Sequence, residues 1–215
     1  MNRAATKRGQ FITVEGIEGV GKSSNIDFIA DYLRKRGHKV RTTREPGGTA
    51  VGERIREVVL HAEPGVVSER CELLLMFAAR AAHLDGLILP ALSRGDWVVC
   101  DRFTDATYAY QGGGRGLPDA DIAGLERLVQ KELAPDLTIL LDASLEVTVE
   151  RRRERGLMDR FESEELNFFR RVQEKYRDIA AANPDRVRLI DASSNFAVVR
   201  AKLGKILDDF LNNIH

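Results

Sequence analysis

The sequence is poor in the features that mark secreted, zinc-binding or membrane-spanning proteins. Its 215 residues include only two cysteines, Cys71 and Cys100, which are too few and too isolated for a disulfide framework or a zinc site. We expect both to be small core residues in a reducing compartment, which predicts a cytoplasmic protein. No apolar run approaches the roughly 18 residues of a membrane span, so no membrane contact is expected.

The sequence also lacks an excess of either charge. Lysine and arginine together number 33, as do aspartate and glutamate, so no overall field attracts a polyanion and no nucleic acid partner is expected. Residues 1–10 are basic but have no apolar centre like that of a signal peptide, and we interpret them as a frayed tail. No internal repeat or low-complexity linker is present, which predicts a single domain over residues 1–215.

Five short apolar runs predict strands. They are rich in valine, isoleucine and leucine without clean alternation, as expected when both faces of a sheet are covered. The runs are residues 11–15, 39–42, 97–100, 137–141 and 187–190. Because helical periods lie between them, the pattern predicts an α/β fold with a five-stranded parallel sheet and helices on both faces.

A glycine-rich segment, residues 16–23, lies between the first predicted strand and an amphipathic helical pattern. Its sequence GIEGVGKS has the spacing of a phosphate loop. Glycines let backbone N–H groups turn toward a phosphate, and the following helix directs its positive end there. The pattern alone also fits a chance turn with a solvent-facing lysine, but the flanking strand and helix favour the phosphate loop.

The loop implies specific contacts with ATP and its metal. We expect Lys22 to reach the outer phosphates and to be catalytic, and the Ser23 hydroxyl to bind Mg²⁺. The predicted ATP-binding residues of this segment are Gly16, Ile17, Glu18, Gly19, Val20, Gly21, Lys22, Ser23 and Ser24.

Charged residues follow two other predicted strands. Asp101 follows the run 97–100, where we favour a carboxylate that holds Mg²⁺ through water; a cap on the next helix is the alternative, and the two roles are compatible. Arg44 and Arg102 can bind a second phosphate through their planar guanidinium groups. Either arginine alone fits a surface residue, but the two together predict a phosphorylated acceptor, and hence phosphoryl transfer rather than hydrolysis.

An arginine-rich segment spans about residues 150–162, with five arginines among residues 150–160. Such runs are usually solvated faces. This one lies between two helical stretches, so we favour a lid that delivers positive charge to the transferring group on closure.

Two predicted helix faces suit a small planar ligand. Met76 and Arg80 share one face with Phe77 beside them. Thr107, Tyr110 and Gln111 share another face. Periodicity alone is also consistent with core and surface positions, and only the nearby aspartate and arginines favour a ligand site.

The motifs together resemble those of bacterial thymidylate kinases over essentially the whole chain. The matching segments are residues 15–23 (EGIEGVGKS), 43–49 (TREPGGT), 101–103 (DRF), 109–116 (AYQGGGRG) and the arginine-rich segment. The first is shared by many nucleotide enzymes, whereas the ordered set is specific. The resemblance implies a phosphate-loop fold and transfer of the γ-phosphoryl group of ATP to dTMP with Mg²⁺. It also implies a homodimer of packed helices.

The resemblance assigns roles on the acceptor side. Glu18 matches an acidic residue that reaches the sugar 3′-hydroxyl, and Tyr110 matches a ring that crowds the 2′ position. Arg44 and Arg102 match the clamp on the acceptor phosphate. The residues that match thymine-reading groups are Arg80, Thr107 and Gln111. The family usually has a phenylalanine stacked on the thymine where this chain has Met76, so either Met76 or Phe77 is the candidate stacking residue.

The resemblance also assigns roles on the ATP side. The phosphate loop offers only Lys22, and family members of this kind supply further charge from the lid. Arg153 is the first candidate for this catalytic role, followed by Arg151 and Arg155. Asp191 and Ala192 match a loop that lies beside the adenine.

Two rival functions remain. A kinase for another deoxynucleoside monophosphate shares every feature except the base-reading groups. A nucleotide-dependent switch normally carries an Asn-Lys-x-Asp motif, which this sequence lacks, and leaves Arg44 and Arg102 unexplained.

Overall fold

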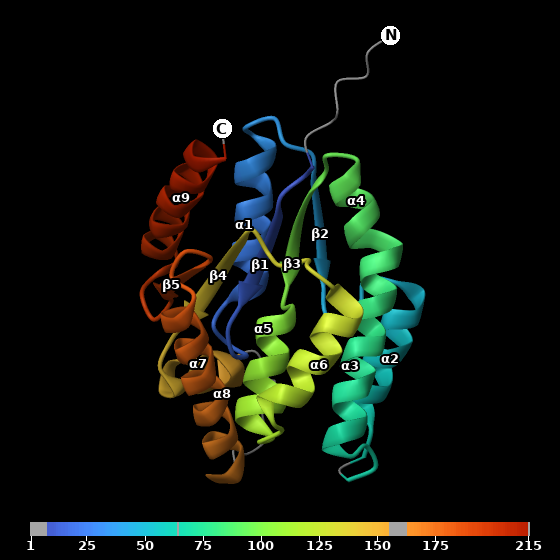
Figure 1. Cartoon of the computed structure of the whole chain (residues 1–215). Coiled ribbons are helices and arrows are strands. Elements are labelled where there is room, and N and C mark those ends of the chain that lie inside the picture. Colours follow the sequence, from blue (N-terminus) through green and yellow to red (C-terminus); the bar gives the residue numbers. More distant parts are fainter. Residues whose placement is uncertain (1–7, 64, 155–162, 215) are drawn as a thin grey trace.

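The structure is a computed structural model that describes residues 8–63, 65–154 and 163–214, apart from the side chains of residues 152, 154 and 163–165. A five-stranded sheet crosses its centre, and every strand pair is parallel (Figure 1). The strands are β1 (Phe11–Glu15), β2 (Val40–Arg44), β3 (Trp97–Asp101), β4 (Leu137–Asp142) and β5 (Val187–Asp191), in the order β2-β3-β1-β4-β5. The predicted α/β architecture is confirmed.

The strand boundaries differ slightly from the predicted ones. β2 begins one residue later than predicted and continues to Arg44, because Arg44 pairs with Asp101 at the end of β3. β3, β4 and β5 each extend one residue past the apolar run, to an aspartate. The ladder hydrogen bonds of a parallel sheet do not depend on side-chain polarity, so they carry the strands into the charged residues of its carboxyl edge.

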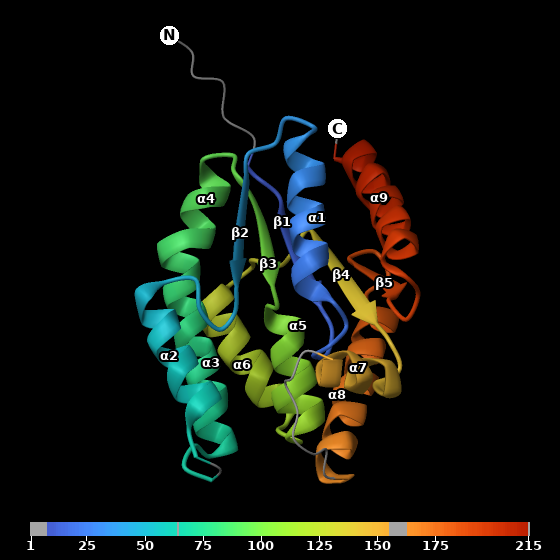
Figure 2. The ribbon, with the colours of Figure 1, turned by 180° about the vertical axis from the view of Figure 1, so that it is seen from behind.

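Helices cover both faces of the sheet. They are α1 (Lys22–Arg34), α2 (Ala50–His61), α3 (Glu69–His83), the π-helix η1 (Leu84–Ile88), α4 (Leu89–Ser93), α5 (Thr104–Thr107), the π-helix η2 (Tyr108–Gly114), α6 (Asp119–Gln130), α7 (Leu145–Glu154), α8 (Ser163–Ala182) and α9 (Phe196–Asn213). α1 packs against α9, and the two helices lie in front of the sheet in Figure 2. α5, η2 and α8 pack together near the carboxyl ends of the strands, in the lower half of Figure 1.

Local sequence explains where several helices begin. The side chain of Thr49 accepts a hydrogen bond from the Gly52 N–H at the start of α2, and Asn195 accepts one from the Val198 N–H at the start of α9. α1 begins after Gly21, whose φ of 91° suits glycine. The predicted apolar stripe of α1, Ile26, Ile29, Ala30 and Leu33, is buried.

The helical run from α3 through η1 to α4, residues 69–93, is long and apolar enough to cross a membrane by length and composition alone. The sequence reading missed this run because its charged residues interrupt the apolar ones. Much of it is buried within the fold, where Phe77, Leu84 and Ile88 are almost completely covered. We interpret it as a core helix.

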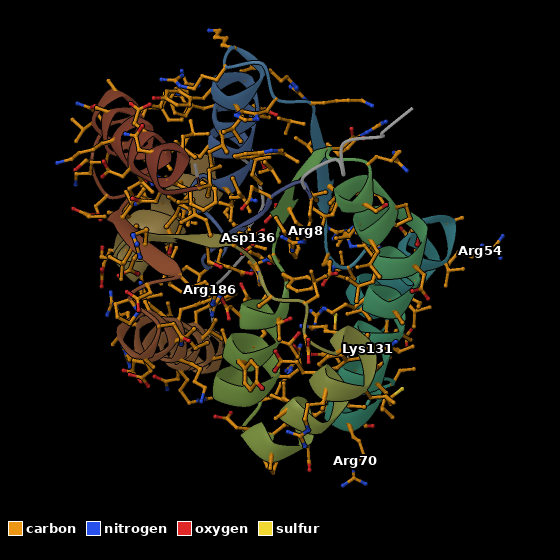
Figure 3. All side chains as sticks on the ribbon, turned by 45° about the horizontal axis from the view of Figure 1, so that its top comes forward. Arg8, Arg54, Arg70, Lys131, Asp136 and Arg186 are labelled. Atoms are coloured by element: carbon orange, nitrogen blue, oxygen red, sulfur yellow. The ribbon has the colours of Figure 1, made fainter. Side chains whose placement is uncertain are left out.

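Two expectations need correction. Cys100 is buried as expected, but Cys71 is exposed, because it lies in the first turn of α3 on the side away from the core. Residues 8–10 were predicted to belong to a frayed tail, and the structure contradicts this for them. Arg8 forms an ion pair of 2.9 Å with Asp136 (Figure 3). The Asp136 carboxylate also accepts a hydrogen bond from the Phe11 N–H at the start of β1. Residues 8–10 are therefore anchored to the sheet.

Candidate active site

The carboxyl ends of β1, β3 and β2 bring the predicted site residues together. The register places Val14 of β1 opposite Asp101 of β3, and Asp101 opposite Arg44 of β2. The glycine-rich loop leaves β1 immediately beyond this point, and Arg102 follows Asp101. Parallel pairing therefore sets the loop, the carboxylate and both arginines along one edge of the sheet.

The loop over residues 16–21 has a backbone that requires glycine. Gly16 and Gly19 have φ angles of 134° and 86°. A Cβ atom would lie 2.3 Å from the Leu141 carbonyl oxygen at Gly16 and 2.6 Å from the Thr148 carbonyl oxygen at Gly19. The loop is thus pressed against β4 and α7. Glu18 is exposed on its outer side.

Lys22 lies folded over the loop. Its Nζ donates to the carbonyl oxygens of Gly16 and Ile17, at 3.1 and 3.2 Å. Burial, together with the nearby Arg102 cation, lowers the pKa of Lys22 to about 7. An anion placed in the loop would offer this ammonium a better partner than two neutral carbonyl groups.

Ser23 and Asp101 line one cavity of about 360 Å³, which Arg44 also lines. The Asp101 Oδ1 atom is buried and has no hydrogen-bond partner within the part of the chain that the structure describes. Leaving a buried carboxylate oxygen unpaired is costly, so a cation at this point is favoured. Hydroxyl and carboxylate oxygens are ligands that suit Mg²⁺, which keeps several waters. Ser23 and Asp101 therefore fit the predicted metal site.

In the described part of the chain, no denser cluster competes with Ser23 and Asp101 for a metal. Among the described residues, no group of three or more histidine, cysteine, aspartate or glutamate side chains is arranged to hold a metal ion. Any Mg²⁺ bound here would take its remaining ligands from water and phosphate.

Arg102 is held in an unusual conformation. Its φ is 67°, a left-handed value that is strained for a residue with a side chain. The guanidinium donates to the hydroxyl oxygens of Tyr110, at 2.9 Å, and Tyr176, at 3.2 Å. Burial alone lowers the pKa of Arg102, but these two tyrosines and the Asp101 carboxylate outweigh it and raise the pKa. Arg102 therefore remains a fixed cation at the site.

Glu15 supports Arg102 through Tyr176, which contacts both residues. The sequence reasoning gave Glu15 no role. One carboxyl oxygen accepts the Phe103 N–H at 2.7 Å, and the other pairs with the Tyr176 hydroxyl at 2.8 Å. Burial, and secondarily the charge of Asp105, raises the pKa of Glu15 to about 8, although Arg102 opposes the shift. The signal available in the sequence was a charged glutamate at the end of a strand that is apolar except for its threonine.

Arg80 is completely buried at the end of α3. Its Nε donates to Glu45 at 2.7 Å, one Nη to Thr107 at 2.9 Å and the other to Gln130 at 3.4 Å. The rings of Phe77 and Phe103 lie 4.8 and 4.9 Å from its guanidinium carbon. The structure thus joins two of the predicted base-reading residues, Arg80 and Thr107. The sequence reasoning missed the buried Glu45 and Gln130.

The three residues of the second predicted face, Thr107, Tyr110 and Gln111, contact different neighbours. Thr107 ends α5, and Tyr110 and Gln111 lie in the wider η2 helix, so the expected α-helical spacing does not hold. The Tyr110 hydroxyl accepts a hydrogen bond from Arg102, whereas the Thr107 hydroxyl accepts one from Arg80. Gln111 is 5% exposed and donates through Nε2 to Glu72 of α3 at 2.7 Å.

The structure separates the two candidate stacking residues. Phe77 packs in a core cluster with Leu73 and Ile122. Met76 lies one helical turn from both Glu72 and Arg80, on the face of α3 that meets Thr107 and Gln111. Met76 is therefore better placed than Phe77 beside the predicted base-reading groups.

A second cavity of about 190 Å³ opens on the other side of the loop. Its lining residues are Val20, Gly21, Ser24, Asn25, Arg151, Ala192, Ser194, Phe196 and Val199. Arg151 donates to the Ala192 carbonyl oxygen at 3.0 Å, so α7 and the segment after β5 meet here. The exposed Asp191 carboxylate accepts the Ser193 N–H, which holds its pKa below the usual value. This cavity joins Ser24, Arg151 and Ala192 from three distant parts of the chain.

The predicted lid is described only in part. Arg153 is exposed and pairs with Glu150 at 3.8 Å. Arg155 and residues 156–162 lie outside the described residues. On the acceptor side, Arg44 is half exposed and pairs with Glu53 at 2.8 Å.

Comparison with known proteins gives one consistent family. The sequence matches the family model described as thymidylate kinase over residues 14–203. A thymidylate kinase of Pseudomonas syringae pv. tomato is 53% identical over 203 residues, covering 94% of this chain and 97% of that protein. One of Chromohalobacter salexigens is 54% identical over 205 residues, with the same coverage. The crystal structure of thymidylate kinase from Ehrlichia chaffeensis has a TM-score of 0.77 at 32% identity, covering 94% of this chain and 99% of that one.

The raised pKa of Glu15 predicts how stability changes with pH. The carboxyl loses its proton near its ordinary value of 4.5 in the unfolded chain but near 8 in the folded protein. The free energy of unfolding should therefore fall between about pH 5 and 8, by up to about 1.4 kcal/mol per pH unit. Glu15→Gln should flatten this slope in urea denaturation. The exposed Glu174→Gln should not, and parallel curves for wild type and Glu15→Gln would contradict the assignment.

Proposed function

The chain belongs to the thymidylate kinase family and transfers the γ-phosphoryl group of ATP to dTMP, giving dTDP and ADP; we propose that Lys22 with its loop holds the ATP phosphates and that Arg44 and Arg102 hold the dTMP phosphate. The observation that carries this assignment is the placement of two separate cationic groups on one sheet edge, on either side of Asp101. A simple hydrolase has no use for the second group.

The site aligns the two substrates and neutralises the charge of their phosphates. The acceptor phosphate oxygen is already anionic, so the chain does not need to supply a nucleophile or a covalent intermediate. Arg102 can form two parallel hydrogen bonds to a phosphate, and its tyrosine contacts pre-position it before the substrate arrives. Lys22 and the loop N–H groups hold the donor opposite, which brings two mutually repelling anions into line.

We assign the magnesium ion to Ser23 and Asp101. When bound, Mg²⁺ neutralises charge on the ATP phosphates. The unpaired Oδ1 of Asp101 and its place beside Ser23 in one cavity support this choice.

The remaining predicted residues take roles around the two substrates. Arg80, Thr107 and Gln111 read the thymine, and Met76 rather than Phe77 lies against its ring. Tyr110 and Glu18 contact the acceptor sugar. The adenine occupies the cavity lined by Ser24, Arg151 and Ala192, with Asp191 beside it. The lid arginines, Arg153 and Arg155, together with Arg151, add charge on closure.

We also propose that the protein is a cytoplasmic homodimer that binds neither nucleic acid nor membrane. Large apolar side chains are exposed on three neighbouring helices, at Val51 and Val58 of α2, Leu74 of α3 and Leu128 of α6. α3 packs against both α2 and α6, so these side chains lie on adjoining elements (Figure 1). A second copy would cover them. The free cysteines support a reducing compartment.

Steady-state assays with a panel of acceptors test the activity and the rival kinase functions together. ADP should form with ATP·Mg²⁺ and dTMP, matched by dTDP in the mass spectrum, and much more slowly with dCMP or AMP. Lys22→Ala and Arg102→Ala should each lower turnover at least about 100-fold. The exposed Lys35→Ala is the control. ADP formed equally without acceptor would refute phosphoryl transfer to dTMP, and near-normal turnover in either variant would refute that residue's role.

The lowered pKa of Lys22 predicts proton uptake on ATP binding. Near pH 8 most Lys22 side chains are neutral in the free protein, since their pKa is about 7, and the ATP phosphates should restore the charge. Calorimetry in two buffers of different ionisation enthalpy should show uptake approaching about one proton at pH 8 and little at pH 6. Lys22→Arg, which stays charged, should show none at either pH. No uptake by the wild type at pH 8 would mean that Lys22 is already charged.

The dimer is tested by one charged substitution on its proposed interface. Leu74→Glu should reduce the mass measured by light scattering from about twice 24.0 kDa toward 24.0 kDa. Val198→Glu places the same charge at an exposed apolar position on α9 and should leave the dimer intact. A monomeric wild type, or a dimeric Leu74→Glu variant, would contradict the proposed interface.

A further inference from the structure

Two side-chain contacts connect α3 to the α5–η2 segment. Arg80 of α3 donates to Thr107, and Glu72 of α3 accepts from Gln111. Glu72 and Arg80 are two helical turns apart, roughly 12 Å along the axis. Met76 lies midway between them on the same face. The Arg80–Thr107 contact therefore bounds one end of the proposed thymine site, and the Glu72–Gln111 contact bounds the other.

The Glu72 contact determines which way the Gln111 carboxamide faces. A carboxylate has only acceptor atoms, so the atom of Gln111 that meets it must be the amide nitrogen. The two atoms are 2.7 Å apart. The second Glu72 oxygen accepts from Arg115 at 3.2 Å, which anchors the carboxylate. The carboxylate side chain is only 14% exposed, so little water competes for it.

The carbonyl oxygen of Gln111 is left for another partner. This Oε1 atom is buried and has no hydrogen-bond partner among the residues that the structure describes. A buried unpaired carbonyl oxygen lowers stability, so a site that retains one is suited to a ligand donor. The pyrimidine edge of thymine offers one such donor, the N3–H group. Cytosine has an unprotonated N3, which would repel the carbonyl oxygen.

We propose that Glu72 is a positioning residue for base specificity, because it holds Gln111 with its carbonyl oxygen toward the base and thereby selects pyrimidines that carry an N3–H donor. The inference rests on the proposed role of Gln111 in reading thymine. Glu72 itself does not touch the substrate. It excludes the opposite orientation of Gln111, in which the amide nitrogen would donate to N3 of cytosine.

The variant Glu72→Gln tests the proposal with little change of shape. A glutamine at position 72 can donate as well as accept, so Gln111 is free to take either orientation. Calorimetric affinities for dTMP, dUMP and dCMP would be measured on the whole protein. The ratio of dTMP to dCMP affinity should fall about tenfold. The ratio of dTMP to dUMP affinity should not change, because thymine and uracil have the same N3–H and O4 groups.

Two further variants isolate the contact. Glu69→Gln removes an exposed charge from the first turn of the same helix and should leave all three affinities unchanged. In a Gln111→Ala background, Glu72→Gln should have no further effect on the dTMP to dCMP ratio, because the two residues act as one unit. The affinity for ATP should be the same in all variants.

The outcomes separate this inference from the proposed function. An unchanged dTMP to dCMP ratio in Glu72→Gln, with normal dTMP binding by the wild type, overturns the role of Glu72 and leaves the kinase assignment intact. An equal loss for all three nucleotides also overturns it, because that result indicates a structural role. A wild type that fails to bind dTMP would contradict the proposed function itself.

Discussion

The hydrogen bond from the Phe103 N–H to the buried carboxyl of Glu15 joins the two halves of the active site. Glu15 ends β1 immediately before the phosphate loop, and Phe103 follows the arginine that we assign to the acceptor phosphate. The bond holds the chain in the turn that gives Arg102 its left-handed conformation. Through Tyr176, the same carboxyl also supports the Arg102 side chain. Donor-side and acceptor-side groups are therefore fixed relative to each other before either substrate binds.

This arrangement has an electrostatic consequence. A site built to bind two phosphorylated anions gathers cations that repel one another when the anions are absent. The lowered pKa of Lys22 relieves part of that repulsion, because burial and Arg102 favour its neutral form. Arg102 cannot relieve it in the same way, since its tyrosine contacts and Asp101 keep it charged. Of these two groups, Arg102 is thus a permanent cation in the free protein, whereas the charge of Lys22 would be completed by the proposed ATP phosphates.

Sequence reasoning recovered the parts of the site that depend on local pattern. The phosphate loop, the strand ends and the spacing of Met76 and Arg80 follow from glycine geometry, parallel pairing and helical period. It did not recover Glu15 or Glu72, because their roles come from partners distant in the chain, Tyr176 and Gln111. Periodicity can place a tyrosine of α8 in the core, but it cannot say what its hydroxyl meets. The predicted helix face of Thr107, Tyr110 and Gln111 also failed, because the wider turn of the π-helix η2 places Tyr110 and Gln111 against different neighbours.

The proposed base-reading side of the site is supported in the same way as the phosphate side. In both, a carboxyl group with little exposure fixes the residue that is proposed to meet the ligand. Glu15 acts on Arg102 through Tyr176, whereas Glu45 contacts Arg80 directly and Glu72 contacts Gln111 directly. Arg80 shows why such support is needed, because a completely buried guanidinium beside two aromatic rings has no water to orient or neutralise it. The Glu45 carboxylate supplies that charge, and Thr107 and Gln130 accept from the remaining nitrogens. A rigid donor set that is already paired on one side can discriminate between bases, since it cannot turn to suit the wrong one.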